Sequence, residues 1–199
     1  MYKQESKNEN DISGENSEMK FKNPATKFSA FCFEWLESIV QAIIVVVVLM
    51  AFLFRVVNVS GTSMLNTLHD ADKVIVLKLN YVPKDGDVVV ISRGQNLDEP
   101  LIKRVIATEG QTLSIDFSDG SVTVNGVKLN ETYIKEPMWL QGDGDIPSVI
   151  PKGYTFVMGD NRNHSLDSRF NEVGLIANEN IVGKANFIVF PFNRIGAIV

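Results

Sequence analysis

The chain has 199 residues, 45% of them apolar, and 19 basic against 24 acidic residues give it a net charge of -5. This length allows one sizeable domain with an appendage, and an acidic balance without a basic cluster argues against nucleic acid as a partner. The single cysteine, Cys32, excludes an intramolecular disulfide and a cysteine-based zinc site. With only two histidines and no metal-like spacing of carboxylates, the sequence predicts no metal site and no cofactor.

The amino-terminal part combines a polar tail with one long apolar run. Residues 1–27 are rich in Asn, Ser, Glu and Lys, a composition typical of disorder. From Ile39 to Phe54 all residues but one are apolar. As a helix they would cover roughly 24 Å, so flanking residues must help to cross a hydrocarbon core of ~30 Å. We expect a disordered cytoplasmic tail over 1–34 and a transmembrane helix over 35–57.

The charges that flank this run predict its orientation. Three lysines, Lys20, Lys22 and Lys27, precede it, whereas Arg55 alone follows it closely. This asymmetry places the amino terminus in the cytoplasm and residues 58–199 outside. A buried helix of a soluble protein is a second interpretation, although no polar stripe exists to meet water. A cleavable signal peptide is a third, but the long tail favours an uncleaved anchor.

Residues 58–199 consist of short β-rich stretches separated by turn residues. The clearest prediction is a hairpin over 122–129, in which Asn125-Gly126 favours a type I′ turn and Val124 faces Val127. No helical periodicity of any length follows the apolar run, so we expect a mostly β, antiparallel domain. Further strands are predicted over residues 74–79, 88–91, 155–158 and 181–189, with a turn at 83–86.

A serine followed by a methionine, Ser63-Met64, lies soon after the apolar run. Nine positions separate Phe54 from Ser63, a reach of at most ~30 Å, so this serine would lie close to the outer membrane surface. A serine hydroxyl is a poor nucleophile until a base removes its proton. By itself, the dipeptide indicates only a turn.

Lys103 lies in a stretch, Leu101 to Ala107, whose two strand faces are both apolar apart from Lys103 and Arg104. A lysine acts as a base only when neutral, and its ordinary pKa near 10.4 keeps it charged at pH 7. Apolar burial can lower that pKa by ~3 units, which costs about 4 kcal/mol, whereas the arginine beside it cannot be neutralised in this way. The alternative is a strand-end lysine that extends its amine into water.

A third segment, residues 159–169, holds two carboxylates, two arginines, two serines and two asparagines directly after an apolar stretch. It fits a polar surface loop held by Asp-Arg pairs. It also fits a rigid shelf whose hydrogen bonds orient a base. Because His164 lies within it, a triad of Ser63, His164 and an aspartate is a further possibility.

Together, these segments resemble the bacterial type I signal peptidases, membrane-anchored serine proteases that remove signal peptides from exported proteins. The resemblance implies that Ser63 is the nucleophile and Lys103 the general base. Lysine, where relatives from the endoplasmic reticulum carry histidine, points to the bacterial branch. The matching boxes are Ser63-Met64, residues 86–90, Lys103 to Ile106 and residues 159–169.

The resemblance also implies supporting roles in the third segment. The family serine that hydrogen-bonds the lysine matches Ser165. The structural acidic and basic residues match Asp160, Asp167 and Arg169.

Two positions depart from the family pattern. Gly61 stands where some members place a serine that helps to bind the oxyanion, so the oxyanion would rely on the Ser63 backbone N–H. Asn66 stands where the family usually has proline, which loosens the turn after the nucleophile.

The sequence therefore predicts a membrane-bound endopeptidase with a β domain of the signal peptidase and repressor-autoprotease type. Its implied partners are exported preproteins and the lipid bilayer. The resemblance implies that a preprotein binds in extended form, with small uncharged side chains just before the cleaved bond. Addition of the substrate as a strand to a sheet edge would explain how the enzyme recognises so few side chains. Two rivals remain, a self-cleaving Ser-Lys protease and a non-catalytic anchored β module that binds exported chains.

Overall fold

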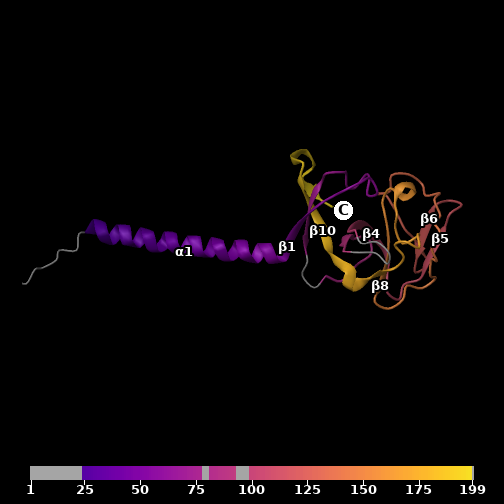
Figure 1. Ribbon diagram of the computed structural model, residues 1–199, viewed down its shortest axis with the longest axis horizontal. Helices are drawn as coiled ribbons and strands as arrows, with labels where there is room; N and C mark the ends of the chain where they lie inside the picture. The colour runs from indigo at the N-terminus through magenta and orange to yellow at the C-terminus, as the bar shows by residue number, and fades with distance from the viewer. Residues whose placement is uncertain (1–23, 78–80, 93–98, 199) are drawn as a thin grey trace, which may run out of the picture. The chain divides into compact units, whose positions relative to one another are not determined.

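A computed structural model describes residues 24–77, 81–92 and 99–198, with side chains from Phe31 onward (Figure 1). The chain divides into two compact units, residues 1–46 and 47–199. Of the disordered tail predicted over residues 1–34, residues 1–23 lie outside the described residues, whereas residues 24–34 are helical and the prediction is wrong there.

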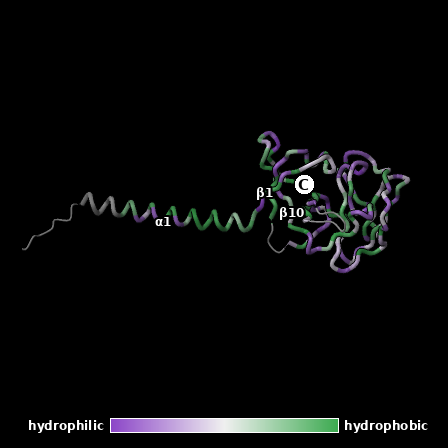
Figure 2. Tube along the Cα trace, in the orientation of Figure 1, coloured by the Kyte–Doolittle hydropathy of each residue, from purple (hydrophilic) through white to green (hydrophobic). Residues whose placement is uncertain are grey.

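The apolar run forms one long helix, α1, from Pro24 to Leu53. Its stretch Phe31–Leu53 is long and apolar enough to cross a membrane, and Figure 2 shows the hydrophobic colour over its carboxyl-terminal half. The helix thus begins and ends earlier than the transmembrane segment predicted over 35–57. Proline suits the start of a helix because its missing N–H needs no partner there. The helix ends early because Phe54 already pairs with Leu77 in a sheet.

The main sheet is antiparallel and has eight strands among the described residues, in the order β1-β2-β10-β3-β4-β8-β9, with β11 paired to β10. This confirms the predicted fold class, a mostly β antiparallel domain. Central strand β3 is buried at all four residues. The strands are β1 (Phe54–Asn58), β2 (Lys73–Leu77), β3 (Val88–Ile91), β4 (Leu101–Thr108), β8 (Tyr154–Met158), β9 (Ile176–Ala177), β10 (Ile181–Phe190) and β11 (Gly196–Ala197).

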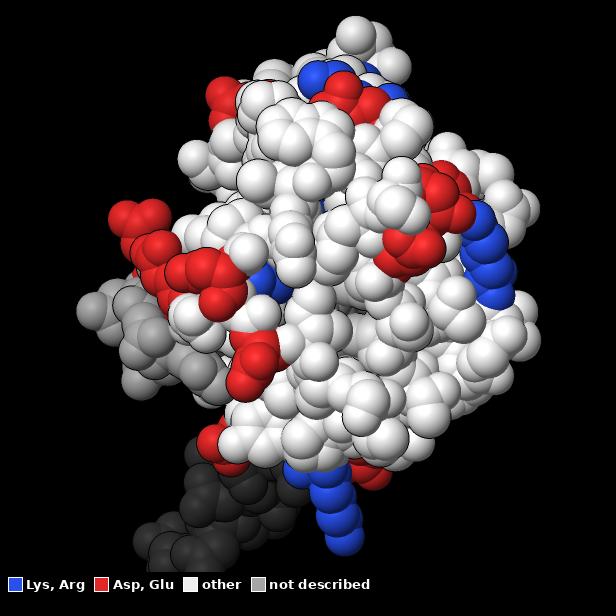
Figure 3. Space-filling view, turned by 90° about the vertical axis from the view of Figure 1, so that its right-hand side faces the viewer, with Lys and Arg blue, Asp and Glu red and all other residues white. Residues whose placement is uncertain are grey.

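A smaller sheet comprises β5 (Leu113–Asp116), β6 (Ser121–Val124) and β7 (Val127–Lys128). The predicted hairpin is confirmed, because Val124 pairs with Val127 and the turn residues Asn125 and Gly126 have φ of 51° and 77°. A type I′ turn requires positive φ at both positions. Figure 3 views the domain from this side and shows scattered acidic side chains with few basic ones.

The predicted strands are largely confirmed. The strand at 88–91 is found as predicted, while those at 155–158 and 181–189 each gain one residue. The strand at 74–79 is found as β2, and its last two predicted residues lie outside the described part of the chain. Three short 3₁₀ turns complete the fold, η1 (Arg162–His164), η2 (Asn178–Asn180) and η3 (Phe192–Arg194).

Buried apolar clusters fix the segments that carry the polar side chains of interest. Met64 and Leu68, on either side of a turn, pack with residues of β2, β3 and β10. Phe156 and Met158 of β8 pack with the smaller sheet, while Val157 packs on the opposite face. Apolar packing on both faces of the sheet therefore holds β8 in place. The loop after β1 is held by its own buried side chains, Met64 and Leu68.

Candidate active site

Ser63 lies in the loop between β1 and β2, at a turn that the chain itself closes. The Leu65 N–H donates to the Thr62 carbonyl at 3.2 Å, and the Leu68 N–H donates to the Met64 carbonyl at 2.8 Å. Met64 is 2% exposed, whereas Ser63 is half-buried. The buried methionine anchors the turn, and the serine beside it faces outward.

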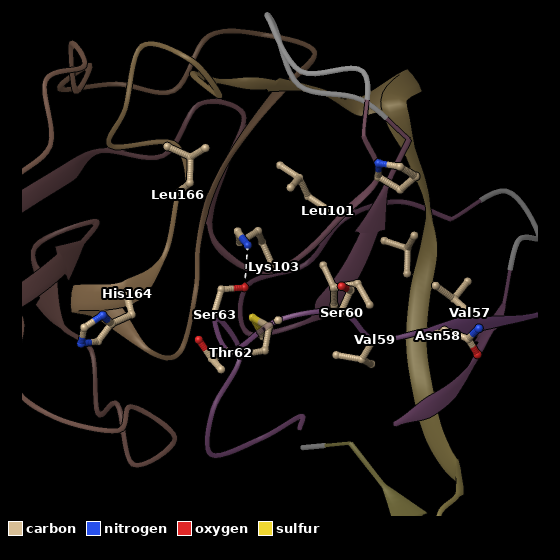
Figure 4. Close-up of a pocket in the computed structure, with 15 residues that line it drawn as sticks. Val57, Asn58, Val59, Ser60, Thr62, Ser63, Leu101, Lys103, His164 and Leu166 are labelled. Atoms are coloured by element: carbon tan, nitrogen blue, oxygen red, sulfur yellow. Dashed lines mark hydrogen bonds between the residues drawn. The ribbon is translucent and has the colours of Figure 1, made fainter. Parts of the chain in front are cut away.

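Lys103 reaches the same point from β4. Its Nζ lies 2.8 Å from the Ser63 Oγ, although the two residues are forty positions apart, and Figure 4 shows the two side chains meeting in a cavity. Lys103 pairs with Val89 of the buried strand β3, and its side chain is almost fully buried. A lysine that extends into water, the alternative from the sequence, is therefore wrong.

Burial lowers the pKa of Lys103 from 10.5 to about 8. Removal of its ammonium group from water is the main cause, because a charge is poorly solvated in an apolar environment. The carboxylates of Asp167 and Asp160 act in the opposite direction, while Arg169 lowers the pKa further. A useful fraction of Lys103 is therefore neutral near pH 7 and can accept a proton.

The Ser63 Oγ opens into a cavity of about 290 Å³. One wall comes from β1, through Val57 and Asn58, and another from the start of β4, through Leu101. Figure 4 shows these side chains to one side of the Ser63–Lys103 pair and His164 to the other. A second cavity of about 280 Å³ shares Val57 and Asn58 with the first.

A buried ion pair lies directly behind the Ser63 loop. Arg104 contacts both carboxylate oxygens of Asp160 at 2.8 Å, and neither side chain is more than 2% exposed. The Thr67 hydroxyl donates to the same carboxylate, and Arg104 donates to the Gly86 carbonyl at 2.7 Å. Thr67 thereby ties the loop that carries the serine to the segment after β8.

A second buried pair fixes the rest of that segment. Arg169 contacts both carboxylate oxygens of Asp167 at 2.8 Å and donates to the carbonyls of Leu140 and Arg162. Asp167 also accepts the Gly159 N–H at 3.0 Å. Of the Asp-Arg pairs expected within residues 159–169, only Asp167–Arg169 forms inside the segment, because Asp160 pairs with Arg104 of β4. Both pairs are buried, so the segment is a rigid interior rather than a surface loop.

Ser165 is packed closely against Gly159 and the loop that carries Ser63. A Cβ at Gly159 would lie 2.2 Å from the Ser165 Oγ and 2.5 Å from the Ser63 carbonyl oxygen. Ser165 is 4% exposed, and its Oγ has no hydrogen-bond partner within the described residues. The hydrogen bond to Lys103 expected from the family resemblance is therefore not formed in this structure.

His164 lines the cavity but is not part of a triad in this structure. Its side chain is exposed and makes no hydrogen bond within the described ranges. Both nearby carboxylates, Asp160 and Asp167, are paired with arginines. Ser63 instead contacts Lys103.

Several supporting residues could not be found from the sequence. Residue type excludes Arg104 as a base, yet Arg104 holds Asp160. Glu131 pairs with Arg162 from 31 positions away, and no local pattern marks such a distant partner. Asn161 donates from its backbone N–H to the Ser63 carbonyl and from its Nδ2 to the Thr62 carbonyl, each at 3.0 Å.

The fold, the site and the matching proteins define the class of this protein: it is a serine endopeptidase. Residues 32–190 match the family model described as "Signal peptidase, peptidase S26", and the chain belongs to that family. The family consists of membrane-associated serine proteases that act on signal peptides of exported preproteins.

Curated relatives come from several bacteria. The chain is 39% identical to a signal peptidase I of Bacillus licheniformis over 82% of this chain and 91% of the relative. It is 40% identical to signal peptidase I T of Bacillus subtilis strain 168, over 81% and 86% respectively. A crystal structure of a signal peptidase I from Enterococcus faecalis V583 matches with a TM-score of 0.41 and 25% identity, covering 52% of this chain and 97% of the solved chain.

Proposed function

We propose that this protein cleaves signal peptides from exported preproteins with Ser63 as nucleophile and Lys103 as general base. The observation that carries the proposal is the contact of 2.8 Å between the Lys103 Nζ and the Ser63 Oγ. It is supported by the burial of Lys103, which lowers its pKa to about 8. A base at that pKa is matched to work near neutral pH.

The reaction follows from this pair. Neutral Lys103 accepts the Ser63 hydroxyl proton while the Oγ attacks the scissile carbonyl carbon, and the Ser63 backbone N–H donates to the oxyanion. Lys103 then gives the proton to the leaving amine, which leaves an acyl-enzyme. Lys103 next removes a proton from water, the resulting hydroxide attacks the ester, and Ser63 regains its proton.

The buried segment after β8 supports this chemistry without touching the substrate. Asp160, Asp167 and Arg169 form ion pairs that keep the segment rigid behind Ser63 and Lys103. The Ser165 hydroxyl is buried beside them and has no partner in the described residues, so it is available to hold the Lys103 amine once Ser63 is acylated.

The cavity suits an extended chain with small uncharged residues before the cut. Its walls include apolar side chains such as Val57 and Leu101. Strand β1 forms one edge of the main sheet among the described strands. An edge strand offers unpaired backbone groups to which a substrate strand can add, so backbone hydrogen bonds would supply affinity and the cavity would supply specificity.

The chain would be anchored by α1 as a single span, with the tail before it in the cytoplasm and the catalytic domain outside. The span's apolar composition supports the anchor, and the three lysines before it against Arg55 after it support the orientation. In this division, the helix covers Pro24–Leu53 and the catalytic β domain begins at Phe54.

The test uses the full chain in detergent micelles with a labelled preprotein. We expect cleavage by the wild type and a loss of at least about 1,000-fold in Ser63→Ala and Lys103→Ala, since each removes half of the pair. Binding of the preprotein without cleavage by the wild type would favour the non-catalytic module. Cleavage of the chain itself in place of the preprotein would favour the self-cleaving protease.

A further inference from the structure

Asn161 makes two contacts with the Ser63 loop that the proposed reaction leaves unused. Its side-chain Nδ2 donates to the Thr62 carbonyl, and its backbone N–H donates to the Ser63 carbonyl, each at 3.0 Å. Asn161 is 1% exposed and does not line the cavity. One buried residue therefore holds two successive carbonyl oxygens of the loop from the interior side.

The geometry of a peptide unit links the contact at the Thr62 carbonyl to the direction of the Ser63 N–H. A trans peptide is planar, and its C=O and N–H bonds point in opposite directions. The unit between Thr62 and Ser63 carries the Thr62 carbonyl on one side and the Ser63 N–H on the other. Because the carbonyl points at the Asn161 amide, the Ser63 N–H points away from it. That N–H donates no hydrogen bond within the described residues.

The backbone that carries the Asn161 amide is held by its two neighbours. It lies between Asp160 and Arg162, which are both fully buried and ion-paired. The Thr62 carbonyl has a second donor, the Leu65 N–H at 3.2 Å, but Leu65 belongs to the same turn and moves with it. Asn161 thus holds the Thr62–Ser63 peptide plane in a fixed orientation relative to the rigid interior.

We propose that Asn161 is a positioning residue that fixes the Thr62–Ser63 peptide plane and thereby aims the Ser63 N–H at the oxyanion. The inference rests on the proposed function, because it takes Ser63 as the nucleophile. Asn161 acts only through Ser63 and does not touch the substrate. Its effect is therefore confined to the transition state.

Two substitutions separate this role from simple space filling. Asn161→Ala removes the Nδ2 donor, and we expect kcat to fall about 10-fold, less than the 10²–10³-fold typical for loss of an oxyanion donor itself. Asn161→Asp keeps the shape but places a carboxylate oxygen against the Thr62 carbonyl oxygen, and we expect a fall of about 100-fold. If Asn161 only filled space, aspartate would be the milder change, so an Asn161→Asp variant as active as wild type would overturn the inference.

Asn163 supplies a matched control two residues further on. It is also a buried amide, at 5% exposure, and its Nδ2 donates to the Glu136 carboxylate and the Pro137 carbonyl at 3.0 Å. It thus holds a different loop. Asn163→Asp introduces the same buried charge, so we expect a comparable loss of thermal stability but a kcat within about 3-fold of wild type. Equal losses of kcat at the two positions would overturn the inference.

The oxyanion is probed directly with a substrate-like peptide aldehyde. The Ser63 Oγ adds to the aldehyde carbon, its proton passes to Lys103, and the former carbonyl oxygen carries the negative charge. We expect the Ki of the aldehyde to rise by the same factor by which kcat falls in each Asn161 variant. We expect no change in the KM or in the Kd of the non-covalent product peptide, because neither depends on the Ser63 N–H. The rise of kcat/KM with pH toward 8 should also stay unchanged, because it reports Lys103.

The measurements use the full chain in detergent micelles, with Ser63→Ala alongside. Full activity of Asn161→Ala with an inactive Ser63→Ala would overturn this inference and leave the proposed function standing. An active Ser63→Ala would overturn both. A fall in kcat with an unchanged aldehyde Ki, or with a shifted pH limb, would also overturn it, because Asn161 would then act through Lys103.

Discussion

At the scale of single residues, Lys103 combines burial with a titratable charge. Its folded-state pKa of about 8 lies below its ordinary value of 10.5, chiefly because it is buried. Between these two values the unfolded chain binds more protons than the folded one, so stability rises with pH across that window. Below pH 8, the folded state carries the full penalty of a buried charge, about 3 kcal/mol for a shift of this size.

Removal of the amine should therefore stabilise the fold while it abolishes activity. We expect Lys103→Met to raise the free energy of unfolding at pH 7 by up to about 3 kcal/mol, since methionine keeps an unbranched apolar stem. The gain should shrink as the pH rises from 8 to 10.5. Urea denaturation at pH 7 and at pH 10 measures both effects. A destabilised Lys103→Met at pH 7 would show that Lys103 is held as a charged structural group.

The same titration predicts the pH dependence of the reaction. We expect kcat/KM to rise about 10-fold per pH unit below 8 and then to level off, because only neutral Lys103 accepts the proton. Lys103→Arg should be as inactive as Lys103→Ala, because a guanidinium stays charged. Preprotein cleavage from pH 6 to 10, with folding followed by circular dichroism, measures this. Near-normal turnover of Lys103→Arg would contradict the mechanism.

His164 should be dispensable, although it lines the cavity. It is exposed and makes no side-chain hydrogen bond among the described residues. We expect the His164→Ala variant to keep most of the cleavage activity. The His69→Ala variant serves as the control, because His69 lies outside the cavity. A loss as large as that of Ser63→Ala would restore the triad.

At the scale of elements, the close approach of Ser165 and of the Ser63 loop to the end of β8 makes Gly159 irreplaceable. A Cβ there would collide with the Ser165 Oγ and the Ser63 carbonyl oxygen. We expect Gly159→Ala to displace the Ser63 loop, with a stability loss of about 1–3 kcal/mol and a large loss of kcat. Gly196→Ala is the matched control, because the nearest atom to its Cβ is 4.0 Å away. Thermal melts and cleavage rates of the two variants test this, and equal behaviour would contradict it.

The buried ion pair that joins β4 to the segment after β8 should matter far more than an exposed one. Asp160→Asn removes the carboxylate while the Arg104 guanidinium stays buried, and we expect a loss of about 3 kcal/mol. Asp119→Asn breaks an exposed pair with Lys128, and little change is expected. Urea midpoints of both variants decide the comparison. Similar midpoints would mean that Asp160 contributes little to the fold.

At the scale of the whole molecule, the proposed topology places the catalytic domain outside the cell. We expect protease added to spheroplasts to digest the chain after Arg55 and to spare the part before Trp35. Cys32 should resist a thiol reagent that cannot cross membranes, and react after permeabilisation. Protection of the carboxyl-terminal domain in intact spheroplasts would contradict the orientation and the exported substrate together.

The local elements and the chemical candidates follow from the sequence alone. Alternation and turn residues predicted the hairpin around Asn125-Gly126, and a β-rich stretch after a turn predicted the strand Val88–Ile91. Both depend on neighbours a few positions apart. A long apolar run, broken only by Gln41, predicted α1. Ser63 and Lys103 were predicted from their residue types, their apolar surroundings and the family resemblance.

Which of these groups come into contact depends on the folded arrangement of the strands. The contact between Ser63 and Lys103 spans forty positions and depends on β4 pairing in the centre of the sheet. The depressed pKa of Lys103 depends on burial that no local pattern measures. Asn161, which holds the Ser63 loop from almost a hundred positions away, was marked by the sequence only as one of two asparagines in the polar segment 159–169. Long-range contacts of this kind arise from packing of the whole sheet, and the local pattern of a chain does not encode them separately.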